Sequence, residues 1–142
     1  MPRLNIELPE TLPFYTELTV RIDDINYGHH LGHDSLVSLL HEARLRFLRH
    51  HGFSEADCGD GSGIVLASLE VAYQAEAFLG DTLVIAVGVD SLGRSGADLL
   101  YAVYRESDRQ PIARARTGIV FFDYQTRRPR RVPQAFRERF GA

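Results

Sequence analysis

Residues 23–33 form a short polar loop that gathers side chains able to transfer protons or to bind anions. The loop contains two Asp, one Asn, two Gly and three of the six His in the chain. A strand-like run precedes it and a helix-like run follows it, so these groups meet the start of a predicted helix. Nowhere else in the sequence do so many such groups adjoin a predicted helix start.

The chemistry that this loop could perform follows from its residue types. An Asp can act as a general base or as a nucleophile, and the loop offers Asp23 and Asp24. The first N–H groups of a helix have no intrahelical partner, and the helix dipole favours negative charge beside them. A carboxylate and free N–H donors together suit attack on a carbonyl group, whose oxygen gains negative charge in the transition state.

The strand before the loop is predicted over residues 14–22, where apolar residues alternate at Leu18, Val20 and Ile22. Residues 1–13 carry three prolines and are expected to be irregular.

The helix after the loop is predicted over residues 34–50. It opens at His33 or Asp34, and Asp34 and Ser35 are both favourable N-cap types. One apolar stripe runs along it at helical spacing, formed by Leu36, Leu39, Leu40, Ala43 and Phe47.

Four further strands are predicted after the helix, over residues 64–78, 82–92, 97–106 and 111–123. The connections between them are short, which favours antiparallel hairpins. A single amphipathic helix needs a surface to cover it, and this sheet is the partner available. The predicted fold class is therefore α+β, with a curved antiparallel five-stranded sheet over one long central helix. Dimerisation is the simplest way to cover the outer face and the edge strands, so we expect a homodimer or homotetramer.

The composition restricts the function further. At 142 residues the chain is expected to be a single domain over residues 1–142, and a net charge of −3 does not favour nucleic acid as a partner. No apolar run reaches the roughly 18 residues that a membrane span needs, and residues 1–10 do not resemble a signal peptide. We therefore expect no membrane partner and a cytoplasmic location. Cys58 has acidic neighbours, which favours an unreactive thiol.

The layout and the loop resemble a known family. The order of elements resembles the hotdog fold, and the loop resembles that of the 4-hydroxybenzoyl-CoA thioesterase-like branch of acyl-CoA thioesterases. That branch carries the pattern R-x-x-D-x-D-x-x-G-H-V-N-N. Here Arg21 and Asp24 match its Arg and first Asp, Asn26 replaces its second Asp, His29 replaces its Gly and His30 matches its His.

The rest of the resemblance lies downstream and spans roughly residues 14–134. Leu31 stands at the pattern's Val, and residues 32–33 stand at its Asn pair. Residues 42–44 match an E-A-R segment of the family's helix, while residues 71–77 and 113–123 resemble its long strand and its last strand.

The resemblance implies an acyl-CoA thioesterase that hydrolyses an acyl or aryl thioester to an acid and a free thiol, without a metal or an organic cofactor. It implies that Asp24 is the base or nucleophile, that His30 orients the substrate or the loop, and that Glu42 is the rival carboxylate. The predicted substrate-binding residues are Tyr27, Gly28, His29, Leu31, Arg94 and Ser95, of which Arg94 could equally be a solvated surface arginine. The basic residues 127–131 are a further candidate for contacting the phosphates of coenzyme A.

Each of these assignments has a structural alternative that the sequence leaves open. Asp24 could order the loop through an Asx-turn or an N-cap, His30 could satisfy a buried carbonyl, and Glu42 could pair with Arg46 at i+4. A metal site at His29 and His33 is disfavoured because the two residues straddle the loop and the helix start. Two other functions stay open: a hotdog hydratase or dehydratase, and a non-catalytic module that binds acyl thioesters.

Overall fold

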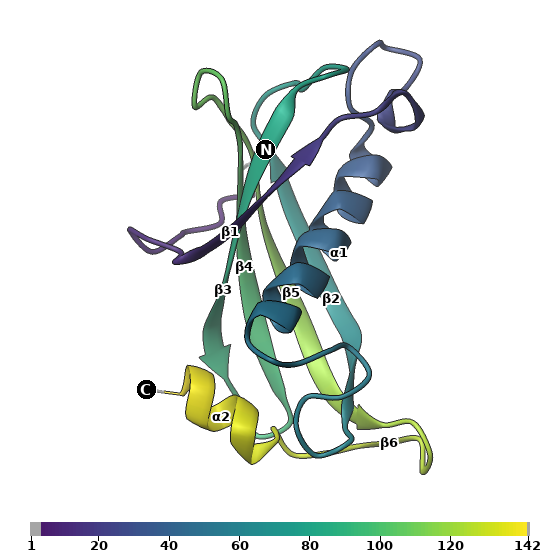
Figure 1. Cartoon of the computed structure of the whole chain (residues 1–142), viewed down its shortest axis with the longest axis vertical. Coiled ribbons are helices and arrows are strands. Elements are labelled where there is room, and N and C mark those ends of the chain that lie inside the picture. Colours follow the sequence, from purple (N-terminus) through teal and green to yellow (C-terminus); the bar gives the residue numbers. More distant parts are fainter. Residues whose placement is uncertain (1–3, 142) are drawn as a thin grey trace.

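The computed structural model describes residues 4–141. It contains an antiparallel sheet, a central helix, a short 3₁₀ turn and a second short helix (Figure 1). In chain order the elements are β1 (Phe14–Thr19), η1 (Ile22–Asp24), α1 (His33–His50), β2 (Gly63–Tyr73), β3 (Thr82–Leu92), β4 (Gly96–Arg105), β5 (Pro111–Asp123), β6 (Arg128–Pro129) and α2 (Gln134–Phe140).

The sheet has the strand order β1-β3-β4-β5-β2, and the short β6 pairs with the end of β5. All pairings are antiparallel, as predicted. On β3 the fully buried Leu83, Ile85 and Val87 alternate along the strand and belong to the core cluster. Figure 1 shows α1 lying obliquely across one face of this sheet, which confirms the predicted α+β hotdog layout.

The predicted apolar stripe of α1 packs against the sheet, and each of its five residues is buried. The prediction of Asp34 or Ser35 as the N-cap is wrong, because the helix already begins at His33 and Gly32 is its N-cap. A glycine N-cap has no side chain with which to cap the helix, and no side-chain cap bond is present. The helix start is therefore left with free donors.

Two strand boundaries differ from the predictions. The first strand ends at Thr19 instead of Ile22, because η1 turns the chain there and the Asp24 carboxylate accepts a hydrogen bond from the Arg21 N–H at 2.9 Å. The second strand ends at Tyr73 instead of Phe78 and carries a bulge between Leu66 and Ser68. Bulges of this kind bend a strand and increase its twist.

The N-terminal segment, residues 4–13, has no regular structure, as expected, but it covers the sheet face opposite α1. Ile6 is 3% exposed, and its carbonyl accepts a hydrogen bond from Arg114 at 3.1 Å. Val84 and Ala86 are also buried although they lie outside the core cluster under α1. Part of the outer face is therefore covered by the chain itself, whereas the sequence assigned this role to a second subunit.

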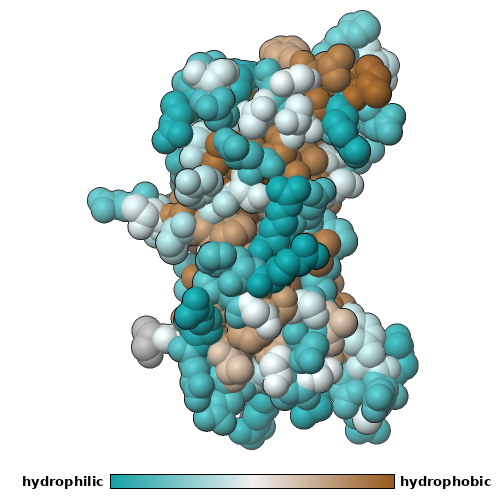
Figure 2. Space-filling view, in the orientation of Figure 1, coloured by the Kyte–Doolittle hydropathy of each residue, from teal (hydrophilic) through white to brown (hydrophobic). Residues whose placement is uncertain are grey.

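Strand β2 forms one edge of the sheet and is the most exposed of the long strands. Its exposed apolar side chains include Val65, Leu66 and Leu69. Figure 2 shows that hydrophilic residues dominate the exposed side of α1. Among residues 4–141, no helix is long and apolar enough to cross a membrane.

Candidate active site

The predicted catalytic loop closes on itself between η1 and α1. The Gly32 N–H donates to the Asp24 carbonyl and the Asn26 N–H donates to the His30 carbonyl, both at 2.9 Å. The Asn26 side-chain oxygen also accepts from the Gly28 N–H at 2.9 Å. These bonds hold the loop as a miniature hairpin whose tip is formed by residues 27–29.

His29 lies at the loop position where the resemblance has glycine. Its φ is +68°, in the left-handed region, and a side chain other than glycine is strained in that region. The loop thus keeps the backbone conformation that a glycine would favour, although the residue has changed.

A cavity of about 460 Å³ opens beside the loop and the first turn of α1. This volume falls within the range of about 300–1,000 Å³ that is typical of small-molecule sites. The loop and helix contribute five residues and the chain around the end of β2 contributes most of the rest; the lining is Asn26, His30, Leu31, His33, Leu36, Tyr73, Gln74, Ala75, Glu76, Ala77 and Ile112.

His30 lines this cavity from the loop, next to His33 at the start of α1. Its Nδ1 lies 3.2 Å from the Leu31 carbonyl oxygen. A carbonyl can only accept a hydrogen bond, so the contact favours the tautomer with the proton on Nδ1. Nε2 then carries the lone pair, and a Cβ placed on Gly28 would lie 3.2 Å from this atom. The absence of a side chain at Gly28 therefore leaves room around Nε2.

The start of α1 supplies hydrogen-bond donors at the same place. The first bond of the helix runs from the Leu36 N–H to the Gly32 carbonyl at 3.0 Å. The N–H groups of residues 33–35 therefore have no intrahelical acceptor. Because His33 lines the cavity, this helix end lies beside the cavity that His30 lines.

Asp24 occupies a different position from His30. It is only 8% exposed, its Oδ2 accepts the hydrogen bond from the Arg21 N–H, and it does not line the cavity. These contacts fit the alternative role of Asp24, in which its side chain orders the loop.

Glu42 lies on the exposed side of α1 and forms an ion pair with Arg46. Arg46 also donates to the Thr16 hydroxyl at 2.8 Å and to the Glu17 carbonyl at 3.1 Å. The i+4 pair expected from the spacing is therefore present, and it ties α1 to β1. Glu42 does not line the cavity.

The structure separates the residues predicted to bind substrate into three groups. Leu31 is buried and lines the cavity, whereas the loop tip points outward, with Tyr27 fully exposed. Arg94 and Ser95 follow β3 at the far end of the sheet (Figure 1). An 11-residue strand separates this end from the loop, a distance of roughly 35 Å. Within one chain, Arg94 and Ser95 do not meet the loop.

Three polar residues that the sequence analysis had not singled out complete the cavity: Tyr73, Gln74 and Glu76. The Tyr73 hydroxyl donates to the His33 carbonyl at 2.9 Å. Burial, with the nearby charge of Asp34 as a second cause, raises the pKa of Tyr73, which keeps this donor protonated. A sequence signal that could have identified these residues is their position just before the Gly80–Asp81 turn. This stretch lies beside the loop, since the Leu31 N–H donates to the Ala77 carbonyl.

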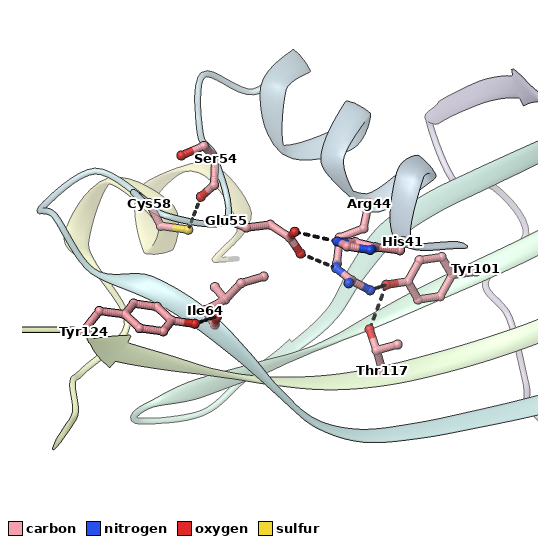
Figure 3. A network of polar contacts seen from close by, with 9 residues as sticks. All are labelled: His41, Arg44, Ser54, Glu55, Cys58, Ile64, Tyr101, Thr117 and Tyr124. Carbon is pink, nitrogen blue, oxygen red and sulfur yellow. Dashed lines mark hydrogen bonds and ion pairs between the residues drawn. The ribbon is translucent and has the colours of Figure 1, made fainter. Parts of the chain in front are cut away.

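A buried polar network crosses the core beneath α1 (Figure 3). Arg44 donates to Glu55 at 2.8 Å and to the Tyr101 hydroxyl at 3.3 Å, and that hydroxyl lies 2.8 Å from the Thr117 hydroxyl. Burial favours the neutral form of Glu55, but the hydrogen bonds from Arg44 and His41 outweigh it and lower its pKa. Arg44 of the E-A-R segment thus joins the helix to the sheet and to the loop after α1.

Three other predictions concern Cys58, the basic run and a metal site. Burial, together with the charges of Asp57 and Asp60, raises the pKa of Cys58 to about 12, as expected for an unreactive thiol. In the basic run, Arg130 pairs with Asp60 at 3.8 Å and with Asp123 at 3.5 Å. Among residues 4–141, no three His, Cys, Asp or Glu side chains are grouped as metal ligands would be.

The chain is similar to known thioesterases in both sequence and structure. The family model described as the thioesterase-like superfamily matches residues 20–140. A search of curated proteins finds no match.

Solved structures give the same fold. A thioesterase of Thermus thermophilus, complexed with coenzyme A and Zn, is 25% identical, with a TM-score of 0.78 over 93% of this chain and 100% of that one. A 1,4-dihydroxy-2-naphthoyl-CoA thioesterase from Synechocystis is 20% identical, with a TM-score of 0.78 over 87% of this chain and 92% of that one. A thioesterase superfamily structure from a Jannaschia species is 22% identical, with a TM-score of 0.82 over 93% of this chain and 83% of that one.

Proposed function

Since the chain belongs to the thioesterase-like superfamily and is a thioester hydrolase, we propose that it hydrolyses acyl-CoA or aryl-CoA thioesters in the cavity between the loop and α1. The observation that carries this proposal is the meeting of His30 with the uncapped start of α1 at one cavity. His30 supplies a base, and the N–H groups at the start of α1 supply hydrogen-bond donors for the oxyanion that develops on the carbonyl oxygen.

In the proposed reaction, His30 activates water. Nε2 takes a proton from a water molecule as the water oxygen bonds to the thioester carbon, and the carbonyl electrons move onto oxygen. The free N–H groups at the start of α1 stabilise this oxyanion, each at a typical value of about 3 kcal/mol in the transition state. The C–S bond then breaks, and the imidazolium returns the proton to the leaving thiolate.

The predicted role of Asp24 as base or nucleophile stays a prediction, and it competes with the assignment to His30. A base must reach its proton within about 3 Å or through one water, and Asp24 is nearly buried behind the loop. We therefore propose that Asp24 positions the loop by capping Arg21. Glu42 is exposed and paired with Arg46, so we assign it no direct step.

We further propose that a second copy of this chain completes the cavity by adding to the edge of β2. The edge exposes Val65, Leu66 and Leu69, and exposed apolar edges of this kind invite pairing with another strand. Tyr73 ends the same strand and lines the cavity. A subunit paired on β2 would therefore stand beside the acyl group. Arg94, Ser95 or the basic run could reach the coenzyme only from such a partner.

Thiol release tests the proposal directly. The purified protein is incubated with acetyl-, octanoyl-, palmitoyl- and benzoyl-CoA, and free coenzyme A is measured with a thiol-reactive dye. We expect catalytic release from at least one ester. Binding of the esters without release would instead indicate a non-catalytic binding module.

The hydratase alternative needs a separate arm of the same experiment. Crotonyl-CoA is added, and loss of its conjugated double bond is followed by absorbance. Hydration faster than thiol release would contradict the proposed reaction, whereas thiol release with the double bond retained would support it.

A further inference from the structure

A second cavity, of about 410 Å³, lies at the opposite end of α1 from the loop. The 18 residues of α1 separate the two sites, a distance of about 27 Å. Four separate segments build this cavity: the N-terminal segment, the end of α1, β3 and α2. Its lining is Pro9, Thr11, Leu12, Pro13, Phe14, Phe47, His50, His51, Val87, Gly88, Val89, Arg139 and Phe140.

Aromatic rings form one side of this cavity. Phe14 packs edge-on against Phe47 with ring centroids 5.6 Å apart, and it contacts His50 at 5.3 Å. Phe140 contacts Phe47 at 5.4 Å and His51 at 4.9 Å. A flat aromatic ligand could add to such a cluster in offset or edge-to-face geometry, which contributes about 0.5–1.5 kcal/mol per pair beyond its buried area.

The ionisable side chains of the lining are all basic. Arg139 donates through Nε to Nδ1 of His51 at 2.9 Å, which leaves the two terminal nitrogens of its guanidinium for a ligand. Burial first, and then the charges of Arg139 and His50, lowers the pKa of His51. Because His51 accepts this hydrogen bond in its neutral form, Arg139 supplies the fixed positive charge that an anion in the cavity would balance.

We propose that this cavity binds an aromatic carboxylate, with the ring among Phe14, Phe47 and Phe140 and the carboxylate on Arg139. The volume exceeds that of a bicyclic arene, and an apolar body with one fixed charge matches an apolar cavity with a few convergent polar groups. The guanidinium is suited to a carboxylate because its paired N–H donors match the two oxygens. This site does not depend on the proposed reaction, because it shares no lining residue with the cavity at the loop.

Titration of the full-length protein with 2-naphthoate, followed by calorimetry and by the imidazole NMR signals of His50 and His51, tests the proposal. We expect saturable binding that shifts both histidines. Arg139→Gln should weaken the affinity about five- to tenfold, and Arg139→Lys should restore part of it. Arg49→Gln is the matched control, because it removes a positive charge from the last turn of α1, near the cavity, at a residue that does not line the cavity. It should leave the affinity unchanged.

Four outcomes would contradict the proposal. The first is equal affinity for 2-naphthoate and for the uncharged 2-naphthalenemethanol, because the cationic group would then have no role. The second is the absence of saturable binding at millimolar concentration, and the third is an affinity that Arg139→Gln leaves unchanged. Tighter binding of octanoate than of 2-naphthoate would contradict the aromatic part of the proposal.

Discussion

His29 is the residue at which local strain and sequence are most clearly linked. Its φ of +68° places a residue with a Cβ in the left-handed region. That conformation costs about 1–2 kcal/mol for residues other than glycine, so a glycine at this position would relieve the strain. Glycine also makes the unfolded chain more flexible, which offsets about 0.5–1 kcal/mol of that relief.

We therefore predict that His29→Gly stabilises the protein by about 0.5–1 kcal/mol. Urea unfolding measures the change, with Ser38→Gly as a control at an exposed position in the interior of α1 that should lose stability. Destabilisation by His29→Gly would mean that the His29 side chain makes a contact that outweighs the strain.

Glu55 is the residue on which the buried Arg44 depends. The Arg44 side chain is 8% exposed, so removing the negative charge of Glu55 would leave a buried guanidinium poorly compensated. We predict that Glu55→Gln lowers the free energy of unfolding by about 2 kcal/mol at pH 7.

The pH dependence of this effect has a definite sign. Because the folded-state pKa of Glu55 lies below its ordinary value of 4.5, the folded state binds fewer protons than the unfolded state. The contribution is complete above pH 4.5 and is lost as the pH falls through the folded-state pKa. Wild type and Glu55→Gln should therefore converge in stability at low pH, and a constant difference down to pH 2 would contradict the assignment.

At the scale of elements, α2 is held against the end of α1 by aromatic contacts and by the Arg139–His51 hydrogen bond. His51 must be neutral at Nδ1 to accept this bond. Its folded-state pKa lies below the ordinary 6.5, first because of burial and then because of Arg139 and His50.

Stability should therefore fall as the pH drops below 6.5 toward that lower pKa, because the unfolded state binds the proton more readily. We predict that His51→Gln, which keeps an acceptor, reduces the slope of the melting temperature between pH 7 and pH 5. His33→Gln, at the opposite end of α1, serves as the control histidine and should leave the slope unchanged. An unchanged slope in His51→Gln would show that His51 does not couple protons to the docking of α2.

The elements could be predicted from the sequence to different extents. Strands β3 and β5 match their predicted ranges, because alternation and flanking turns determine them locally. The N-cap could not be predicted, since Asp34 and Ser35 are better cap types than Gly32 and only the folding of the loop selects the glycine. The packing of residues 4–13 on the outer face depends on long-range contacts that leave no periodic signal.

The candidate site divides in the same way. The sequence located the loop and its His30, because their order along the chain is local information. The sequence could not decide whether Asp24 or His30 lines the cavity, because the closed conformation of the loop determines which side chain lies on the cavity side. Tyr73 and Glu76 were missed because they reach the cavity from another part of the chain.

At the scale of the whole molecule, β2 is an edge strand, and one of its sides has no partner strand among residues 4–141. A symmetric dimer would place the same strand residues near each other across the two-fold axis. Like charges facing one another across paired strands are destabilising.

We predict that Leu66→Lys shifts the protein from dimer to monomer. Light scattering after size-exclusion chromatography measures the mass, and Leu79→Lys is the control, since Leu79 is also exposed but lies outside β2. Dissociation by both variants alike, or a wild-type monomer, would contradict the proposed edge.

We propose that His30 activates water while Asp24 orders the loop. The two roles separate in a comparison of His30→Gln with Asp24→Asn, because Asn keeps an oxygen that can cap the Arg21 N–H but lacks the charge of a base. Single-turnover thiol release should fall about 10²–10⁴-fold in His30→Gln and only a few-fold in Asp24→Asn, with both variants folded by circular dichroism. The reverse pattern, with an active His30→Gln and an inactive Asp24→Asn, would contradict this assignment and would make the loop carboxylate the base or nucleophile.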